Sequence, residues 1–238
     1  MYNYPADRPQ TLPTRAALVL LAVLPLAAQI KPPNLAGVWT GIGLGKTAAG
    51  HQNTPLPDAS ALTAAGLEQM KANPKAADPT VKRCWPPGPV RLMSADREWP
   101  LEIVETRDGL AIINHVHYMA RRIYTDGRSH PNGWDPPPYN GHATGKWEGS
   151  TLVAETVLLN DKVWLSPAGL PQSDEMKMVE RLSTLENGKV LEDQMTLTDS
   201  KFYRAPVAVS RYWLSTPKVE LPPISFACQE KLKVVVSK

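Results

Sequence analysis

The chain has 238 residues, 26 of them basic and 23 acidic, and a formal net charge of +3 at pH 7. This length suits one domain or one large all-β unit. So small a charge provides no field for nucleic acid or an anionic membrane surface, and the composition therefore argues against nucleic-acid binding.

An apolar run occupies residues 16–28, after Arg8 and Arg15, and ends in small residues. This pattern is typical of a secretory signal peptide, and the run is shorter than the ~20 residues that a spanning helix needs. We predict cleavage near Ala28, export to the periplasm or the medium, and a single β domain over residues 29–238. The alternative is that residues 1–28 are retained as a membrane anchor.

Two cysteines, Cys84 and Cys228, lie near opposite ends of the mature chain. In an oxidising compartment such a pair can form a disulfide that closes a long loop, whereas two buried thiols are the alternative. No Cys-x-x-Cys spacing indicates zinc.

One helix is predicted, over residues 61–72. Its residues Leu62, Leu67 and Met70 can share one face, and Pro74 follows closely to end it. The chain has 24 prolines, and several fall in the clusters 32–33, 86–89, 136–138 and 222–223, which predict loops because proline fits neither a helix interior nor a central strand.

Most of the remaining sequence has the pattern of short strands joined by tight turns. Asp108-Gly109, Glu148-Gly149 and Asn187-Gly188 each separate two candidate strands. Within 189–199 the side chains alternate between two faces. One face carries Leu191, Asp193, Met195 and Leu197, and the other carries Glu192, Gln194, Thr196 and Thr198. We predict a mainly β fold, an antiparallel meander closed into a lipocalin-like barrel or a sandwich, with one short helix near the N-terminus.

The stretch "RRIYTDGRSHP", residues 121–131, combines a strand end with a turn. Alternation turns one of Arg121 and Arg122 toward the sheet interior, where an arginine needs a carboxylate partner, and an inward Glu180 opposite Arg122 would form such a buried ion pair. One interpretation is a structural clasp that holds the proline-rich loop 129–140, in which Asp126 binds amides of its own turn. The other is an anion or carbonyl clamp at the mouth of a pocket.

Histidines supply the candidate acid–base chemistry. His115 and His117 lie two residues apart on a predicted strand, so they face the same way. With His130 or His142, and with Glu155 as a carboxylate, they could hold a metal ion; a packed interior patch is the alternative. His142 lies where a loop enters a strand, a place that suits either acid–base catalysis or a structural hydrogen bond.

Several loop residues suit a ligand site. Trp134, Tyr139 and Trp164 lie in predicted loops, where aromatic rings could cover a barrel mouth or bind a ring-containing ligand. Asp174 precedes a strand and could bind nearby amides or pair with Arg128. No phosphate-binding glycine loop, nucleotide fingerprint or haem motif occurs, so no cofactor other than a metal ion is implied.

Two resemblances add expectations. The motifs "CWPPGPVRLM", "RRIYTDGRSHP", "GHATGKWEGSTLVAET", "WLSPAGLPQSDEMKMVERL" and "FACQE", in this order, resemble a family of exported bacterial proteins without an assigned reaction. This resemblance implies export and a shared scaffold, and it brings no catalytic residues. "GVW" around Trp39 resembles the lipocalin signature, in which a late arginine, here Arg211, covers the tryptophan; a plain core role for Trp39 is the alternative.

The sequence thus predicts an exported barrel that binds a small, partly apolar molecule, and it names no reaction. If the protein is an enzyme, a lyase, isomerase or hydrolase using histidine and carboxylate groups fits best. The alternatives are an accessory subunit tethered to a membrane complex by residues 16–30 and a His-ligated metalloenzyme. The candidate catalytic residues are His117, His142 and Glu155. The candidate ligand-binding residues are Arg122, Tyr124, Asp126, Arg128, His130, Trp134, Tyr139 and Asp174.

Overall fold

The computed structural model describes residues 34–95, 99–115 and 119–221. The predicted signal peptide, His117 and Cys228 lie outside the described residues. The signal peptide, the role of His117 and the disulfide therefore stay predictions. No helix among the described residues has the length and apolar character needed to cross a membrane.

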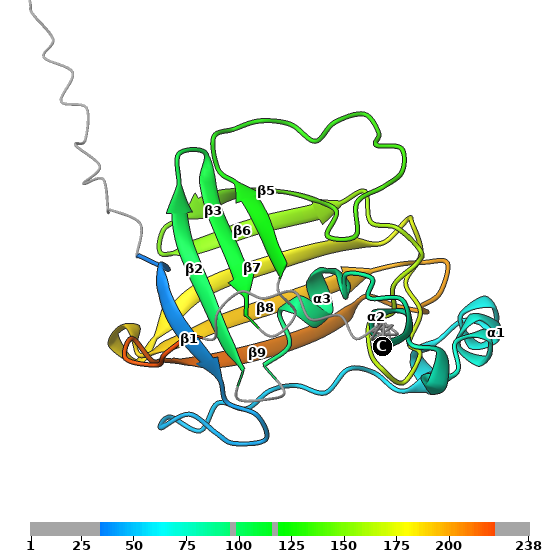
Figure 1. Cartoon of the computed structure of the whole chain (residues 1–238), viewed down its shortest axis with the longest axis horizontal. Helices are drawn as coiled ribbons and strands as arrows, with labels where there is room; N and C mark the ends of the chain where they lie inside the picture. The colour runs from blue at the N-terminus through cyan, green and yellow to red at the C-terminus, as the bar shows by residue number, and fades with distance from the viewer. Residues whose placement is uncertain (1–33, 96–98, 116–118, 222–238) are drawn as a thin grey trace, which may run out of the picture. The chain divides into compact units, whose positions relative to one another are not determined.

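Nine strands form a closed barrel, in which each strand pairs with the next and β1 pairs with β9 (Figure 1). The strands are β1 (Gly37–Gly41), β2 (Pro100–Thr106), β3 (Gly109–Asn114), β4 (Met119–Tyr124), β5 (His142–Glu148), β6 (Thr151–Val157), β7 (Lys177–Leu185), β8 (Val190–Thr198) and β9 (Val207–Ser215). The mainly β, barrel prediction is confirmed, and closure leaves no sheet edge exposed.

One pair of neighbouring strands is parallel. β4 and β5 pair through Ile123 with Ala143 and through Tyr124 with Thr144, whereas the other neighbours in the barrel are antiparallel. A ring with an odd number of strands cannot alternate direction throughout, so nine strands require such a pair. Parallel strands cannot be joined by a two-residue turn. The proline-rich segment 125–141, the green arch at the top of Figure 1, makes this connection.

The predicted hairpins are present at Asp108-Gly109, Glu148-Gly149 and Asn187-Gly188. Gly109 has a φ of +151°, and a Cβ there would lie 2.0 Å from the carbonyl oxygen of Ile123. The first hairpin therefore needs glycine because its backbone approaches β4 closely.

The predicted helix forms as α1 (Ala64–Ala72), where the Thr63 side chain accepts a hydrogen bond from the Gly66 amide at 3.1 Å. Two further helices were not predicted, α2 (Pro79–Lys82) and α3 (Gly88–Leu92). The proline clusters had been assigned to loops. Each of these helices instead places proline in its first turn, where no intrahelical amide bond is lost. Short 3₁₀ turns are η1 (Ala59–Ala61), η2 (Lys75–Ala77) and η3 (Glu186–Gly188).

The core lies inside the barrel, and α3 contributes to it through Val90 and Leu92. The Asn114 side chain donates to the carbonyl oxygen of Leu92 at 3.0 Å and so ties α3 to the end of β3. The predicted alternation along β8 is confirmed, since its inward residues are all buried. The largest fully buried apolar side chains are Leu35, Leu62, Leu92, Met93, Leu101, Ile103, Ile112, Ile123, Leu152, Leu159 and Trp213.

Candidate functional site

The barrel interior contains a buried ion pair. Arg121 faces inward and donates from Nη1 to Oε1 of Glu180 at 2.9 Å and from Nη2 to Oε2 of the same carboxylate. Its Nη2 also faces Oγ1 of Thr156 at 3.4 Å. The side chains of Arg121 and Glu180 are 1% and 0% exposed. The inward arginine is therefore Arg121, and Glu180 pairs with it and not, as the sequence had suggested, with Arg122.

A second carboxyl group adjoins this pair. Asp193 is fully buried, and neither of its oxygens has a hydrogen-bond donor among the described residues. Burial, and next the nearby Glu180 carboxylate, raise the pKa of Asp193 well above its usual range. A protonated Asp193 can itself donate to Glu180, which accounts for the missing donor. The interior thus places a buried ion pair beside a further buried carboxyl group, whose cross-strand neighbour on β9 is the buried Arg211.

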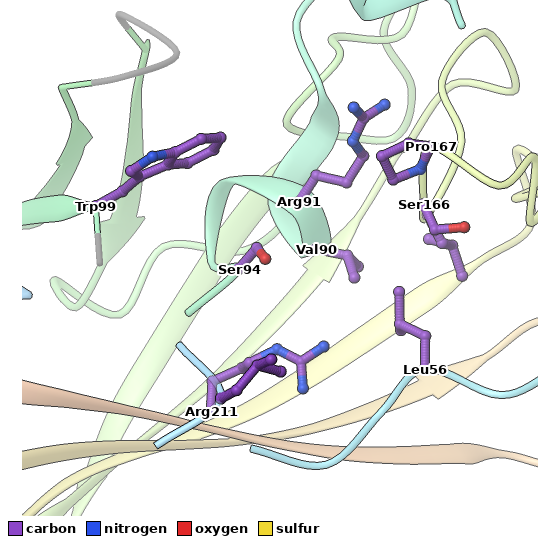
Figure 2. Close-up of a pocket in the computed structure, with 10 residues that line it drawn as sticks. Leu56, Val90, Arg91, Ser94, Trp99, Ser166, Pro167 and Arg211 are labelled. Atoms are coloured by element: carbon purple, nitrogen blue, oxygen red, sulfur yellow. The ribbon is translucent and has the colours of Figure 1, made fainter. Parts of the chain in front are cut away.

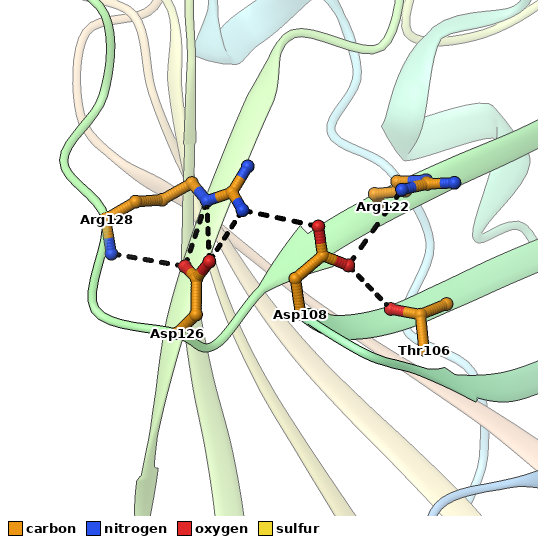
Figure 3. A network of polar contacts seen from close by, with 5 residues as sticks. All are labelled: Thr106, Asp108, Arg122, Asp126 and Arg128. Atoms are coloured by element: carbon orange, nitrogen blue, oxygen red, sulfur yellow. Dashed lines mark hydrogen bonds and ion pairs between the residues drawn. The ribbon is translucent and has the colours of Figure 1, made fainter.

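A polar network lies on the outer face of the barrel, where the β2–β3 turn meets the turn after β4 (Figure 3). Nε and Nη2 of Arg128 donate to Asp126 at 2.9 and 2.6 Å, and Nη2 also donates to Asp108 at 3.3 Å. The Asp126 side chain accepts a hydrogen bond from the Arg128 amide at 3.2 Å. The hydrogen bond from the Arg128 side chain lowers the pKa of Asp126. This geometry agrees with the first interpretation of residues 121–131, a structural clasp at the start of the proline-rich loop.

Arg122 belongs to this outer network and not to an interior pocket. Its side chain is 58% exposed, and its Nη1 lies 3.9 Å from Asp108. The assignment of Arg122 to a pocket wall is therefore corrected. The pairing of Ile112 with Arg121 and of Ala111 with Arg122 fixes the register, and neighbouring residues of a strand face opposite ways.

Two histidines and a carboxylate meet beside this network. Nδ1 of His130 lies 2.8 Å from Nδ1 of His142. On the other side of the His130 ring, Nε2 lies 3.1 Å from Oγ1 of Thr144 and 3.5 Å from Oε1 of Glu155. The strand register places Tyr124, Thr144 and Glu155 in one row across β4, β5 and β6. His130 comes from the proline-rich connection and His142 from the first position of β5.

Aromatic contacts fix the His142 ring. The Tyr124 ring stacks on it at 5.2 Å, the His130 ring meets it edge-on at 5.0 Å, and Trp134 lies at 6.3 Å. The Arg128 guanidinium covers the Tyr124 ring at 3.8 Å. Burial, and next the repulsion by His130 in its charged form and by Arg128, lower the pKa of His142. The lowered pKa favours the neutral imidazole, and the ring contacts hold the side chain in place.

A glycine positions His142. Gly141 has a φ of +62°, and a Cβ at this position would lie 2.5 Å from the carbonyl oxygen of Val157. The connection can therefore enter β5 tightly against β6 only with glycine here.

Most of the sequence-predicted site residues come together in this region. Those that do are Tyr124, Asp126, Arg128, His130, Trp134, His142 and Glu155. Two others lie elsewhere. Tyr139 packs against Trp85 with ring centroids 5.9 Å apart, and the carboxylate of Asp174 lies 3.6 Å from Lys201 Nζ. The suggested pairing of Asp174 with Arg128 is not observed.

Of the histidines in the metal-site hypothesis, His117 lies outside the described residues and His115 lies apart from His130 and His142. His115 follows β3 in a turn, not in a strand, and its Nε2 contacts Oε2 of Glu102 at 3.0 Å. Within residues 34–95, 99–115 and 119–221, no group of three or more His, Cys, Asp or Glu side chains could hold a metal ion.

A separate cavity of about 680 Å³ lies beside α3 (Figure 2). It shares no residue with the histidine cluster. Its lining residues are Leu44, Leu56, Val90, Arg91, Ser94, Trp99, Leu165, Ser166, Pro167 and Arg211. Arg91 is held by a bidentate pair with Asp78, with both N···O distances 3.0 Å. The cavity is thus mainly apolar, with hydroxyl and guanidinium groups at fixed points.

Arg211 lines this cavity, and the lipocalin-like contact of Arg211 with Trp39 stays a prediction. Its Nη1 donates to the carbonyl oxygens of Thr54 and Ser210, the latter at 3.1 Å. The Trp39 indole donates to the carbonyl oxygen of Leu35 at 3.1 Å, and Trp39 pairs with Ser215 on β9. Sequence reasoning missed the cavity because its walls combine α3, one residue of β9 and separate loops, which share no periodic pattern.

No protein-family model matches the sequence, and no curated protein matches it at a significant level. The site is therefore argued from its geometry.

Proposed function

We propose that the protein binds a small, partly apolar molecule in the cavity beside α3. The observation that carries this proposal is the cavity itself, whose volume of about 680 Å³ lies within the range of small-molecule sites. The apolar part of the cavity wall includes Leu56, Val90 and Leu165. Trp99 adds an aromatic surface.

The polar groups of the cavity define the ligand further. Ser94 and Ser166 bring hydroxyl groups, and Arg211 brings a guanidinium, which offers several N–H donors in one plane. Arg91 is neutralised by Asp78, so it contributes surface more than charge. A ligand with an apolar body and one carbonyl or carboxylate group matches this lining.

We also propose that the protein is exported and that residues 1–28 are removed. The basic and apolar pattern of this segment supports the proposal. A disulfide between Cys84 and Cys228 is proposed for the same compartment.

Native mass spectrometry of protein purified from its own exported fraction tests these proposals together. We expect a chain that lacks about 28 residues and carries a small-molecule adduct. Its mass should be lower than that of the reduced form by two hydrogen atoms, because the proposed disulfide removes them. Ser166→Trp, which fills the cavity, should lose the adduct. Ser200→Trp is the matched control because Ser200 is exposed and outside the lining. An uncleaved chain that travels with partner subunits, or an adduct that Ser166→Trp leaves in place, would contradict the proposal.

A further inference from the structure

We propose that His142 is a general base on the outer face of the barrel, and that Glu155 and His130 set its protonation through a chain of two imidazoles. The inference goes beyond ligand binding in the cavity, with which this cluster shares no residue. His142 would touch the reacting atoms. His130 and Glu155 would act as positioning residues.

The hydrogen bonds determine which nitrogen of each ring carries the proton. Nδ1 of His130 and Nδ1 of His142 are 2.8 Å apart, so one must donate and the other accept. The Glu155 carboxylate, 3.5 Å from Nε2 of His130, favours a proton on that nitrogen. A neutral His130 protonated at Nε2 then has a bare Nδ1, which accepts from Nδ1–H of His142. The remaining nitrogen of His142, Nε2, is consequently a bare lone pair.

Protonation of this lone pair moves charge toward the carboxylate. When Nε2 of His142 gains a proton, its Nδ1 proton can pass to Nδ1 of His130, and the positive charge then lies beside Glu155. The relay is one imidazole longer than the carboxylate–histidine pair of serine hydrolases. In both, the carboxylate selects the tautomer of the adjacent imidazole and stabilises its charged form. The ionisable groups around His142 are Tyr124 from β4, Arg128 and His130 from the connection, and Glu155 from β6 through His130.

His142 is mostly buried, with 8% of its surface exposed, and Nε2 is the ring nitrogen left for a small molecule. Nε2 of His142 has no hydrogen-bond partner among the described residues, and it is not among their fully buried unpartnered atoms. Trp134, beside the His142 ring, is 54% exposed and offers a surface on which a flat ring can stack. Nη1 of Arg128 makes no hydrogen bond or ion pair to the described residues and can donate to a carbonyl oxygen. Small ring-bearing esters are therefore the substrate class.

The reaction is general-base hydrolysis. His142 Nε2 takes a proton from water as the water oxygen bonds to the ester carbonyl carbon. The carbon–oxygen bond to the leaving group then breaks, and the leaving alkoxide or phenoxide takes the proton back from His142. The products are a carboxylic acid and an alcohol or phenol, and no oxidant or further reactant is needed.

Hydrolysis of p-nitrophenyl acetate by the full chain tests the base. We expect His142→Gln to reduce the rate by about 10²-fold or more, the lower range for a positioned acid–base group. Glu155→Gln should weaken the base, so that the acid limb of the pH–rate profile moves to lower pH. Glu148→Gln is the matched control, because it is another outer-face glutamate, 42% exposed against 49% for Glu155, and bound only to Lys146 and Arg181.

Nitrogen NMR of the histidine rings gives a readout independent of turnover. It should show Nε2 of His142 unprotonated at pH 7, and a changed ring assignment in Glu155→Gln. Full activity in His142→Gln, an acid limb that Glu155→Gln leaves unmoved, or loss of activity with a chelator would each overturn the proposal. Thermal unfolding of each variant checks its fold. The cavity-filling Ser166→Trp should hydrolyse the ester normally, so failure of this proposal and failure of the binding proposal are distinguishable.

Discussion

Replacing Arg121 with methionine tests the buried ion pair and the strand register together. The substitution keeps an apolar stem of similar length and removes the guanidinium that donates to both oxygens of Glu180. Glu180 is fully buried, so its charge would be left without a cation beside a second carboxyl group, Asp193. Breaking a buried pair by removing one partner costs about 3–5 kcal/mol. For a domain of this size, that loss lowers the unfolding midpoint by roughly 6–20 °C.

The loss should depend on pH in a defined direction. Without Arg121, the buried Glu180 carboxylate would have no cation beside it, and burial without a partner disfavours the charged form of a carboxyl group, which raises its pKa in the folded state. A carboxyl group with a raised folded pKa destabilises the fold increasingly as pH rises above the unfolded pKa. In urea unfolding, the loss of unfolding free energy in Arg121→Met, relative to the wild type, should therefore be larger at pH 7 than at pH 5.

Arg122→Met is the matched control, since Arg122 is the next residue and lies on the outer face. Its unfolding midpoint should match the wild type. If Arg122→Met lowered the unfolding midpoint and Arg121→Met left it unchanged, the inward assignment of Arg121 and the register between β3 and β4 would be refuted.

Two further predictions concern Asp193 and Gly141. Asp193→Asn should raise the free energy of unfolding at pH 7, because Asn can donate to Glu180 without ionising; the gain, measured by urea unfolding, should grow as pH rises above about 3.8 and vanish near pH 3. Gly141→Ala should lower the unfolding midpoint and displace the His142 ring signals in NMR spectra, because alanine fits neither the φ of +62° nor the 2.5 Å approach to Val157. An unchanged midpoint would contradict this account of the entry into β5.

The hairpins and the barrel were predictable because each signal is local. Asp108-Gly109 and Asn187-Gly188 specify turns through backbone conformation alone, and alternation along β8 correctly placed Asp193 on the buried face. The parallel pairing of β4 with β5 was not predictable in this way, because it follows from the number of strands in the whole ring.

The histidine cluster was predictable only in part. Tyr124, His130 and His142 lie close in sequence around one loop, so their convergence needed little knowledge of the fold. The inward arginine could not be chosen, because a shift of one residue exchanges the two faces of a strand. Arg211 and Trp99 gave no sign of sharing a cavity, since that depends on how distant loops pack over α3.

Closure of the barrel between β1 and β9 has a consequence for the order of folding. Trp39 pairs with Ser215, and Gly41 with Trp213, so the last seam joins the two ends of the described chain. Contacts so distant in sequence slow folding, because a long loop must be ordered before they form. A chain emerging from a ribosome or a translocation channel therefore cannot complete this ring until residues 207–215 have arrived. Residues 207–215 act as the closing element, and a chain truncated before them would expose the open edges of β1 and β8 to association with other strands.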